Sequence, residues 1–112
     1  MPTTYKTLGQ IDADGTIGTY TTLYTVPAAT STVVSNIVVC NRTASAQYFR
    51  IACSSASASV LTKEFIAFGT TVPANDSIPL VIGITLDTTV KHLMCSATSA
   101  SVSFSAFGAE TT

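Results

Sequence analysis

Two long β-type segments, each preceded by the tripeptide Val-Pro-Ala, constrain the fold of this chain more than any other sequence feature. The first covers residues 32–41 and follows Val-Pro-Ala at 26–28, and the second covers 77–86 and follows the copy at 72–74. Both are rich in Val and Ile, whose branched side chains pack well on a pleated sheet. Proline has no backbone N–H to donate, so each tripeptide interrupts strand pairing. The recurrence, 46 residues apart (72 − 26), predicts two similar halves built from strands.

Turn residues divide the rest of the chain into segments in which apolar and polar residues alternate, the period of a half-buried strand. In residues 19–26, Tyr20, Tyr24 and Val26 fall on one face, which we expect to point into the core. Turn signals recur about every eight to twelve residues, which is typical of a sandwich or barrel. The sequence therefore predicts an all-β fold, a single antiparallel β-sandwich of about eight strands that is jelly-roll-like in its two halves. The expected strands cover residues 3–8, 19–26, 32–41, 47–53, 60–68, 77–86, 89–97 and 102–106.

Chain length and the composition of the two ends set the expected domain organisation. A chain of 112 residues forms one domain, here a β-sandwich over residues 1–112. The start of the chain is open between two alternatives: residues 3–8 form a short first strand, or they belong to an extended N-terminal arm over residues 1–18. We expect residues 108–112 to form a loose tail.

Three expectations concern individual strands. Residues 32–41 place Val33 and Val34 on opposite faces, with further apolar residues beside each, so we expect a strand that is either central or covered by a neighbouring subunit. Pro79 places the segment around it at a sheet edge or at a bulge. Gly69 is expected to end the strand over residues 60–68.

The charge content argues for an assembled protein and against nucleic-acid or membrane binding. Only 10% of the residues are charged and 46% are hydrophobic, whereas about 25% charged residues is usual. A polar surface with so little charge tolerates close neighbours, so we expect an assembled state. The five basic residues are scattered, and duplex nucleic acid needs a basic stripe. The apolar runs are strand-sized, and no signal-peptide pattern opens the chain, so we expect assembly in a host cytoplasm.

The sequence contains no pattern typical of a catalytic, metal or cofactor site. His92 is the only histidine, and Cys95, three residues later, falls on the opposite face of a strand. Asp12 and Asp14 resemble the start of a calcium loop, but the following residues supply neither the further oxygen ligands nor the closing Glu. We therefore predict a protein that is not an enzyme and that has no cofactor and no metal.

The three cysteines are predicted to be buried free thiols. Cys40, Cys53 and Cys95 are too far apart in the sequence for a zinc site. Each lies in an apolar segment, and free cysteine is among the most buried residue types. A disulfide between two of the three remains an open alternative.

Two tyrosines and two arginines are the candidate interface residues: Tyr5, Arg42, Tyr48 and Arg50. Tyrosine combines a large apolar area with one polar end, and arginine is favoured at protein interfaces. The alternatives are a core or sugar-stacking role for the tyrosines and a solvated surface role for the arginines.

With these segments identified, the chain resembles a family of small phage virion β-sandwich structural proteins, of the capsid cement or decoration type found in cyanophage-like viruses. The resemblance covers residues 23–104 and implies no catalytic residue. The segments that carry it are Leu-Tyr-Thr-Val-Pro-Ala at 23–28, Val-Val-Cys-Asn-Arg at 38–42, Tyr-Phe-Arg-Ile-Ala at 48–52, Pro-Ala-Asn-Asp-Ser at 73–77, Gly-Ile-Thr-Leu at 83–86 and Val-Ser-Phe at 102–104.

The resemblance implies a virion location and a structural role. The expected function is that of a cement protein that stabilises the major capsid lattice, with the major capsid protein or other virion proteins as partners and a homotrimer as the expected oligomer. The alternatives are a tail, neck or fibre component and, further from the resemblance, a carbohydrate-binding module that uses exposed tyrosines.

Overall fold

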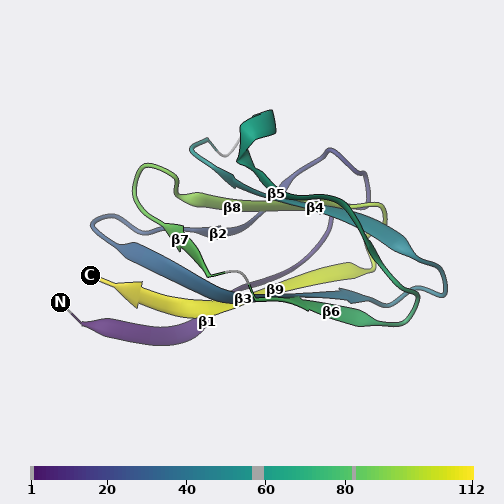
Figure 1. Cartoon of the computed structure of the whole chain (residues 1–112), viewed down its shortest axis with the longest axis horizontal. Helices are drawn as coiled ribbons and strands as arrows, with labels where there is room; N and C mark the ends of the chain where they lie inside the picture. The colour runs from purple at the N-terminus through teal and green to yellow at the C-terminus, as the bar shows by residue number, and fades with distance from the viewer. Residues whose placement is uncertain (1, 57–59, 82) are drawn as a thin grey trace.

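The computed structural model describes residues 2–56, 60–81 and 83–112, and it consists of two β-sheets packed face to face (Figure 1). Most of the chain is in β-strands, as the alternation of apolar and polar residues predicts. The strands of the described residues are β1 (Thr3–Asp12), β2 (Thr21–Thr25), β3 (Ser31–Asn41), β4 (Gln47–Ser54), β5 (Phe65–Val72), β6 (Ser77–Leu80), β7 (Ile84–Leu86), β8 (His92–Ala97) and β9 (Val102–Thr111), with one 3₁₀ turn, η1 (Thr62–Glu64), before β5.

The order of the strands is that of a jelly roll. Sheet A has the order β1-β9-β3-β6, with β7 also paired to β3, and sheet B has the order β2-β8-β4-β5. Every pairing is antiparallel. Strands β6 and β7 lie along successive parts of β3, so they occupy one strand position between them. With β6 and β7 counted as one position, each sheet has four strand positions, and the predicted antiparallel, jelly-roll-like sandwich is therefore confirmed.

Side chains from both sheets fill the space between them. Phe49 of sheet B packs edge to face against Phe104 of sheet A, with ring centroids 6.0 Å apart. Around this pair, aliphatic side chains from nearly every strand are fully buried. One face of each sheet is thus apolar and covered, and the other face is left to form the surface.

The two Val-Pro-Ala copies form turns of the same shape. The residue that follows each copy has a positive φ, 54° at Ala29 and 53° at Asn75. Each turn carries the chain from sheet B to sheet A, from β2 to β3 in the first half and from β5 to β6 in the second. The sequence repeat therefore marks equivalent crossings in the two halves of the jelly roll.

A β-bulge in the middle of β3 changes which side chains face the core. The register of β3 against β9 shifts between Val34 and Asn36. Before the shift Val34 is buried, and after it Ile37 is buried, although the two residues are an odd number of positions apart. Val33, predicted to share a covered face with Ile37, is instead 49% exposed. Strand β3 is central in sheet A, between β9 on one side and β6 and β7 on the other, as one of the two alternatives predicts. Its two faces are not the predicted ones, because a bulge inserts one residue and reverses the alternation, which leaves Val33 exposed within the chain.

The sequence made one prediction about the strand that contains Gly69 and one about the strand that contains Pro79, and only the second is confirmed. Strand β5 does not end at Gly69 but runs on to Val72, because Gly69 adopts a φ of +71° within a bulge opposite β4. Pro79 lies in β6, the last strand of sheet A, which confirms the predicted edge position.

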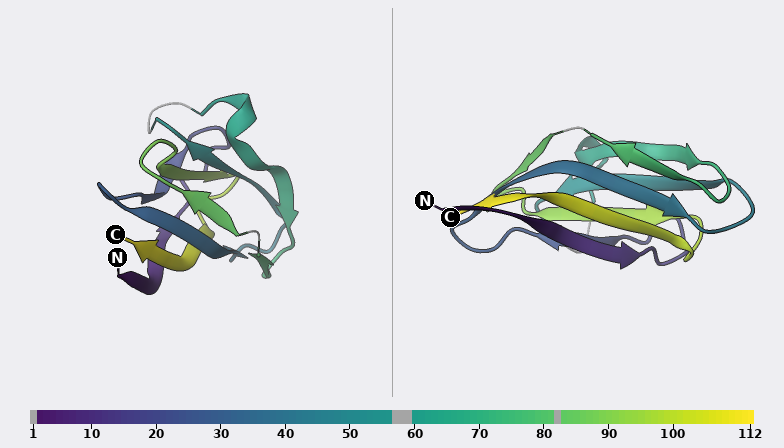
Figure 2. Two further views of the ribbon diagram at one scale, coloured as in Figure 1. Left: turned by 60° about the vertical axis from the view of Figure 1, so that its left-hand side comes forward. Right: turned by 90° about the horizontal axis from the view of Figure 1, so that it is seen from below.

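Both chain ends lie in sheet A, side by side (Figure 2). Residues 3–12 form β1, which pairs with β9 along its whole length. The expected loose tail at residues 108–112 is instead the end of β9, which runs to Thr111 and pairs with β1 on one side and with β3 on the other. Pairing on both sides fixes this segment, since it satisfies its backbone groups.

Candidate assembly surfaces

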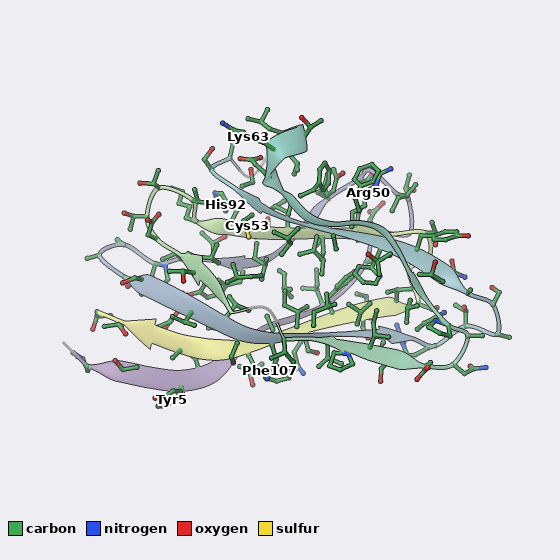
Figure 3. The ribbon with its side chains drawn as sticks, viewed as in Figure 1. Tyr5, Arg50, Cys53, Lys63, His92 and Phe107 are labelled. Carbon is green, nitrogen blue, oxygen red and sulfur yellow. The ribbon has the colours of Figure 1, made fainter. Side chains whose placement is uncertain are left out.

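The outer face of sheet A carries a shallow apolar groove. Tyr5, Ala109 and Val33 lie in register across β1, β9 and β3 and form one row. Phe107 lies beside this row, and a groove of about 520 Å³ follows it across the sheet. Tyr5 is 84% exposed, and Figure 3 shows Tyr5 and Phe107 on the side of sheet A that faces away from sheet B. Exposed apolar rows of this kind are typical of contact surfaces.

The outer face of sheet B carries a cluster of aromatic rings around Arg50, which Figure 3 shows on the side away from sheet A. The Arg50 guanidinium lies 4.1 Å from the centroid of the Phe68 ring, within the range of a cation–π contact. Its Nη1 donates a hydrogen bond to the Tyr20 hydroxyl at 3.4 Å. Phe65 joins Tyr20 and Phe68 through ring contacts with centroids 5.9 and 4.8 Å apart. Arg50 is therefore held by its own chain, since its guanidinium contacts the Phe68 ring and the Tyr20 hydroxyl, and Phe65 packs against both of those rings.

A second apolar hollow, of about 450 Å³, lies beside η1. Leu61, Ile66 and Val90 line it with exposed apolar side chains. The Glu64 carboxylate accepts the backbone N–H of Leu61 at 2.8 Å, and this hydrogen bond lowers the pKa of Glu64. Burial, followed by the charge of Glu64, raises the pKa of the Cys53 thiol to about 11. Cys53 is thus protonated at neutral pH, which makes it a poor nucleophile.

The loops at the end of the sandwich opposite the chain termini are joined through Asn41. Its amide group donates to the carbonyl oxygens of Ser45, Val72 and Pro73 at 2.9 to 3.2 Å. Its side-chain oxygen accepts two hydrogen bonds from Thr43, from the backbone N–H and from the hydroxyl. Asn41 therefore fixes the β3–β4 turn against the β5–β6 turn.

A polar network, buried at Tyr24 and Thr32 and exposed at Lys6, closes the sandwich at the end that holds the termini. The Tyr24 hydroxyl donates to the Glu110 carboxylate and lies 2.8 Å from the Thr32 hydroxyl. Lys6 pairs with the same carboxylate at 3.2 Å. Burial, followed by the hydrogen bond to Glu110, raises the pKa of Tyr24 to about 12, and the Tyr24 hydrogen bond is the main cause that lowers the pKa of Glu110. The network spans both sheets, since Tyr24 comes from β2 and Glu110 from β9.

The four predicted interface residues lie on different parts of the molecule. Tyr5 lies on the outer face of sheet A, and Tyr48 is half exposed on β4 of sheet B. Arg50 packs in its aromatic cluster, and Arg42 pairs with Asp12 at 3.0 Å in the β3–β4 turn region. Both members of that ion pair are exposed, so it contributes little to stability. Only Tyr5 lies on the apolar groove of sheet A.

Sequence reasoning missed Val33 and Phe107, which line the groove with Tyr5. The bulge in β3 turns Val33 outward. In a segment that is apolar at nearly every position, no pattern in the sequence indicates where such a bulge lies. Phe107 was missed because the predicted strand ended at residue 106, whereas β9 continues to Thr111 and carries Phe107 on the face opposite to that of the buried Ala106.

The residues considered for chemistry remain apart in the folded chain. Cys95 is buried in the core, whereas His92 is partly exposed and lies 3.1 Å from the Thr25 hydroxyl through its Nδ1. Cys40, Cys53 and Cys95 are free thiols, of which Cys95 is fully buried and the other two partly buried. Over residues 2–56, 60–81 and 83–112, no three His, Cys, Asp or Glu side chains are grouped closely enough to hold a metal ion. In the same described ranges, no helix has the length and apolarity needed to cross a bilayer.

The chain matches no family model and no curated protein. Its fold is similar to that of chains in three solved structures of infectious bursal disease virus. The Gx strain gives a TM-score of 0.52 at 12% identity, the Gt strain 0.51 at 12%, and the crystal structure of the T13 viral particle 0.50 at 14%. Each match covers 97% of this chain.

The chain spans about a third of the length of those viral chains, since it covers 32%, 32% and 30% of them. At this identity the likeness concerns the fold alone. The chain therefore shares its jelly-roll fold with one part of a chain found in a viral particle.

Proposed function

We propose that this chain is a structural component of a viral particle. The observation that carries the proposal is the match of 97% of the chain to part of a chain in the structures of infectious bursal disease virus. The exposed apolar row on sheet A supports it, because a shell subunit needs a surface that neighbours can cover. The low charge supports it as well, since few charged groups lose hydration when copies pack closely.

Within that role, the resemblance to small phage structural proteins favours a capsid cement or decoration protein bound to the major capsid lattice. A cement protein stabilises a shell by adding buried contact area between subunits that are already in place. Both outer faces of this sandwich carry apolar side chains, around Tyr5 on sheet A and around Phe68 on sheet B. Two such faces allow the chain to contact two neighbours at once.

Fractionated particles test this function. Phage particles that encode the chain are disrupted, heads and tails are separated, and the chain is quantified by mass spectrometry in each fraction. A cement protein is expected in the head fraction at a fixed ratio to the major capsid protein. Its presence in the tail fraction alone would favour the tail, neck or fibre alternative, and its absence from the particles would refute the structural role.

A binding assay tests the cement role directly. Purified protein is mixed with expanded heads that lack it, and the temperature at which the heads release their DNA is compared with and without the protein. We expect the release temperature to rise with bound protein, as binding to the closed shell requires. Purified head proteins in unassembled form serve as the control and are expected to bind less.

A further inference from the structure

Among the residues that the structure describes, no strand pairs with the outer edge of β1, and this free edge differs from the other sheet edges of the sandwich. Natural β-proteins protect their edges with short strands, prolines or bulges. The β6 edge carries Pro79, and β5 contains two bulges against β4. Strand β2 has five residues and a bulge. Strand β1 has ten residues, and although a bulge lies between Thr7 and Gly9, its register against β9 is unbroken over the five residues from Thr3 to Thr7.

The outward-facing backbone groups of β1 follow from its pairing with β9. Thr112 donates its N–H to the carbonyl of Pro2 at 3.2 Å, and this pair continues the β1–β9 register. Hydrogen-bonded and non-hydrogen-bonded pairs alternate along an antiparallel ladder. The N–H and C=O groups of Thr3, Tyr5 and Thr7 therefore point away from β9, toward the free edge.

This edge is complementary to itself. If a second β1 pairs antiparallel about a two-fold axis at Tyr5, Tyr5 lies opposite the second copy's Tyr5, and Thr3 lies opposite Thr7. Three residues in each of two chains then donate one N–H each, which gives about six backbone hydrogen bonds. No like charges oppose each other, because Lys6 lies opposite Thr4 in this register and points toward Glu110 of its own chain.

The same register joins the two apolar rows. Tyr5, Ala109 and Val33 form one row across the outer face of sheet A. With Tyr5 at the axis, the row of one copy continues directly into the row of the other, and the two grooves become neighbours. Facing tyrosines in adjacent strands contribute favourably to sheet pairing.

We infer that β1 is a self-association edge, through which two copies of this chain join their A sheets into one continuous sheet. The inference goes beyond the proposed function, because it names the copy-to-copy contact and its symmetry and does not depend on where in a virion the chain resides. The pairing is isologous, so the same patch serves both partners and the assembly closes at two.

Charge substitutions at Tyr5 test the inference. The side chain of Tyr5 is 84% exposed, so Tyr5→Lys and Tyr5→Glu change the fold little. In the dimer, each variant places two like-charged side chains opposite each other, on residues whose Cα atoms lie about 5.5 Å apart. We expect the dissociation constant, measured by sedimentation equilibrium, to rise about tenfold or more for each variant alone. An equimolar mixture of the two variants is expected to restore the dimer, because opposite charges then face each other, and misfolding could not produce such a rescue.

Tyr48→Lys is the matched control, since Tyr48 is a half-exposed tyrosine on the other sheet, and it is expected to leave the dimer unchanged. Wild-type protein that stays monomeric up to millimolar concentration would overturn the inference, and so would a trimer or a dimer that persists in both single variants. Each of these results leaves the particle fractionation open, so failure here is distinct from failure of the proposed function.

Discussion

Among single residues, Asn41 joins two separate turns through one buried polar side chain. It is 1% exposed, and its amide and carbonyl groups bind backbone or side-chain atoms in two separate turns. A buried amide loses its hydration on folding, and each protein hydrogen bond offsets part of that cost. Asparagine fits this position because it has both donors and an acceptor on a short side chain.

Asn41→Ala removes these hydrogen bonds and leaves three backbone carbonyls without this donor. We expect the free energy of unfolding to fall by about 2–4 kcal/mol. Urea unfolding followed by circular dichroism measures the change. Asn36→Ala, on the same strand but partly exposed, is the control and is expected to cost less than about 1 kcal/mol. Equal losses in the two variants would contradict the role of Asn41.

Because of Glu110, the free energy of unfolding falls as the pH is lowered into the acid range. Its pKa is lowered, first by the Tyr24 hydrogen bond, so the folded state binds this proton less readily than the unfolded state does. A group of this kind contributes stability above its unfolded pKa, near 4.5, and loses the contribution as the pH falls through the lower folded value. We expect Glu110→Gln to reduce the difference in unfolding free energy between pH 7 and pH 3. Glu64 and Asp87, whose pKa values are also lowered, remain in both proteins and form the common background.

At the scale of strands and turns, the sequence predicts the elements well and their exact faces poorly. Alternation and turn residues identified most of the strands, and Pro79 identified an edge, because these signals depend on local chemistry. Two of the predicted strands had wrong bounds: the one over residues 60–68 is β5 at 65–72, and the one over 77–86 is divided into β6 and β7. The bulges in β1, β2, β3 and β5 were not predicted, since a bulge depends on how two distant strands pair. The sequence therefore could not predict that Val33 faces outward, or that a groove lies beside Tyr5. The end of β9 was missed for the same reason, because partners on both sides order a polar tail.

The pairing of β9 with β3 requires a residue without a side chain at Gly108. A Cβ atom placed there would lie 2.0 Å from the Val33 carbonyl oxygen, which is backbone and cannot move aside alone. Gly108→Ala is therefore expected to separate the two strands and to lower the free energy of unfolding by about 2 kcal/mol or more. Ser103→Ala, on the outer face of the same strand, is the control and should change stability by less than about 0.5 kcal/mol. A Gly108→Ala protein with wild-type stability would show that the strands can adjust.

For the whole molecule, the two sheets form one core, and the free cysteines report whether it opens as a unit. Cys95 lies between the sheets, and burial raises the pKa of its thiol to about 12. Cys40 is partly exposed on β3 of sheet A. Since the thiolate is the reactive form, a buried protonated thiol reacts with iodoacetamide only when the surrounding structure opens.

We expect iodoacetamide at pH 8 to label Cys40 in the native protein and Cys95 only in urea. The urea midpoint for Cys95 labelling, measured by mass spectrometry of short labelling pulses, should coincide with the midpoint measured by circular dichroism, as two-state unfolding requires. Labelling of Cys95 at lower urea than the loss of strand signal would mean that the sheets separate before they unfold. In an assembled dimer the same experiment should give a midpoint that rises with protein concentration, because association stabilises the folded chain by mass action.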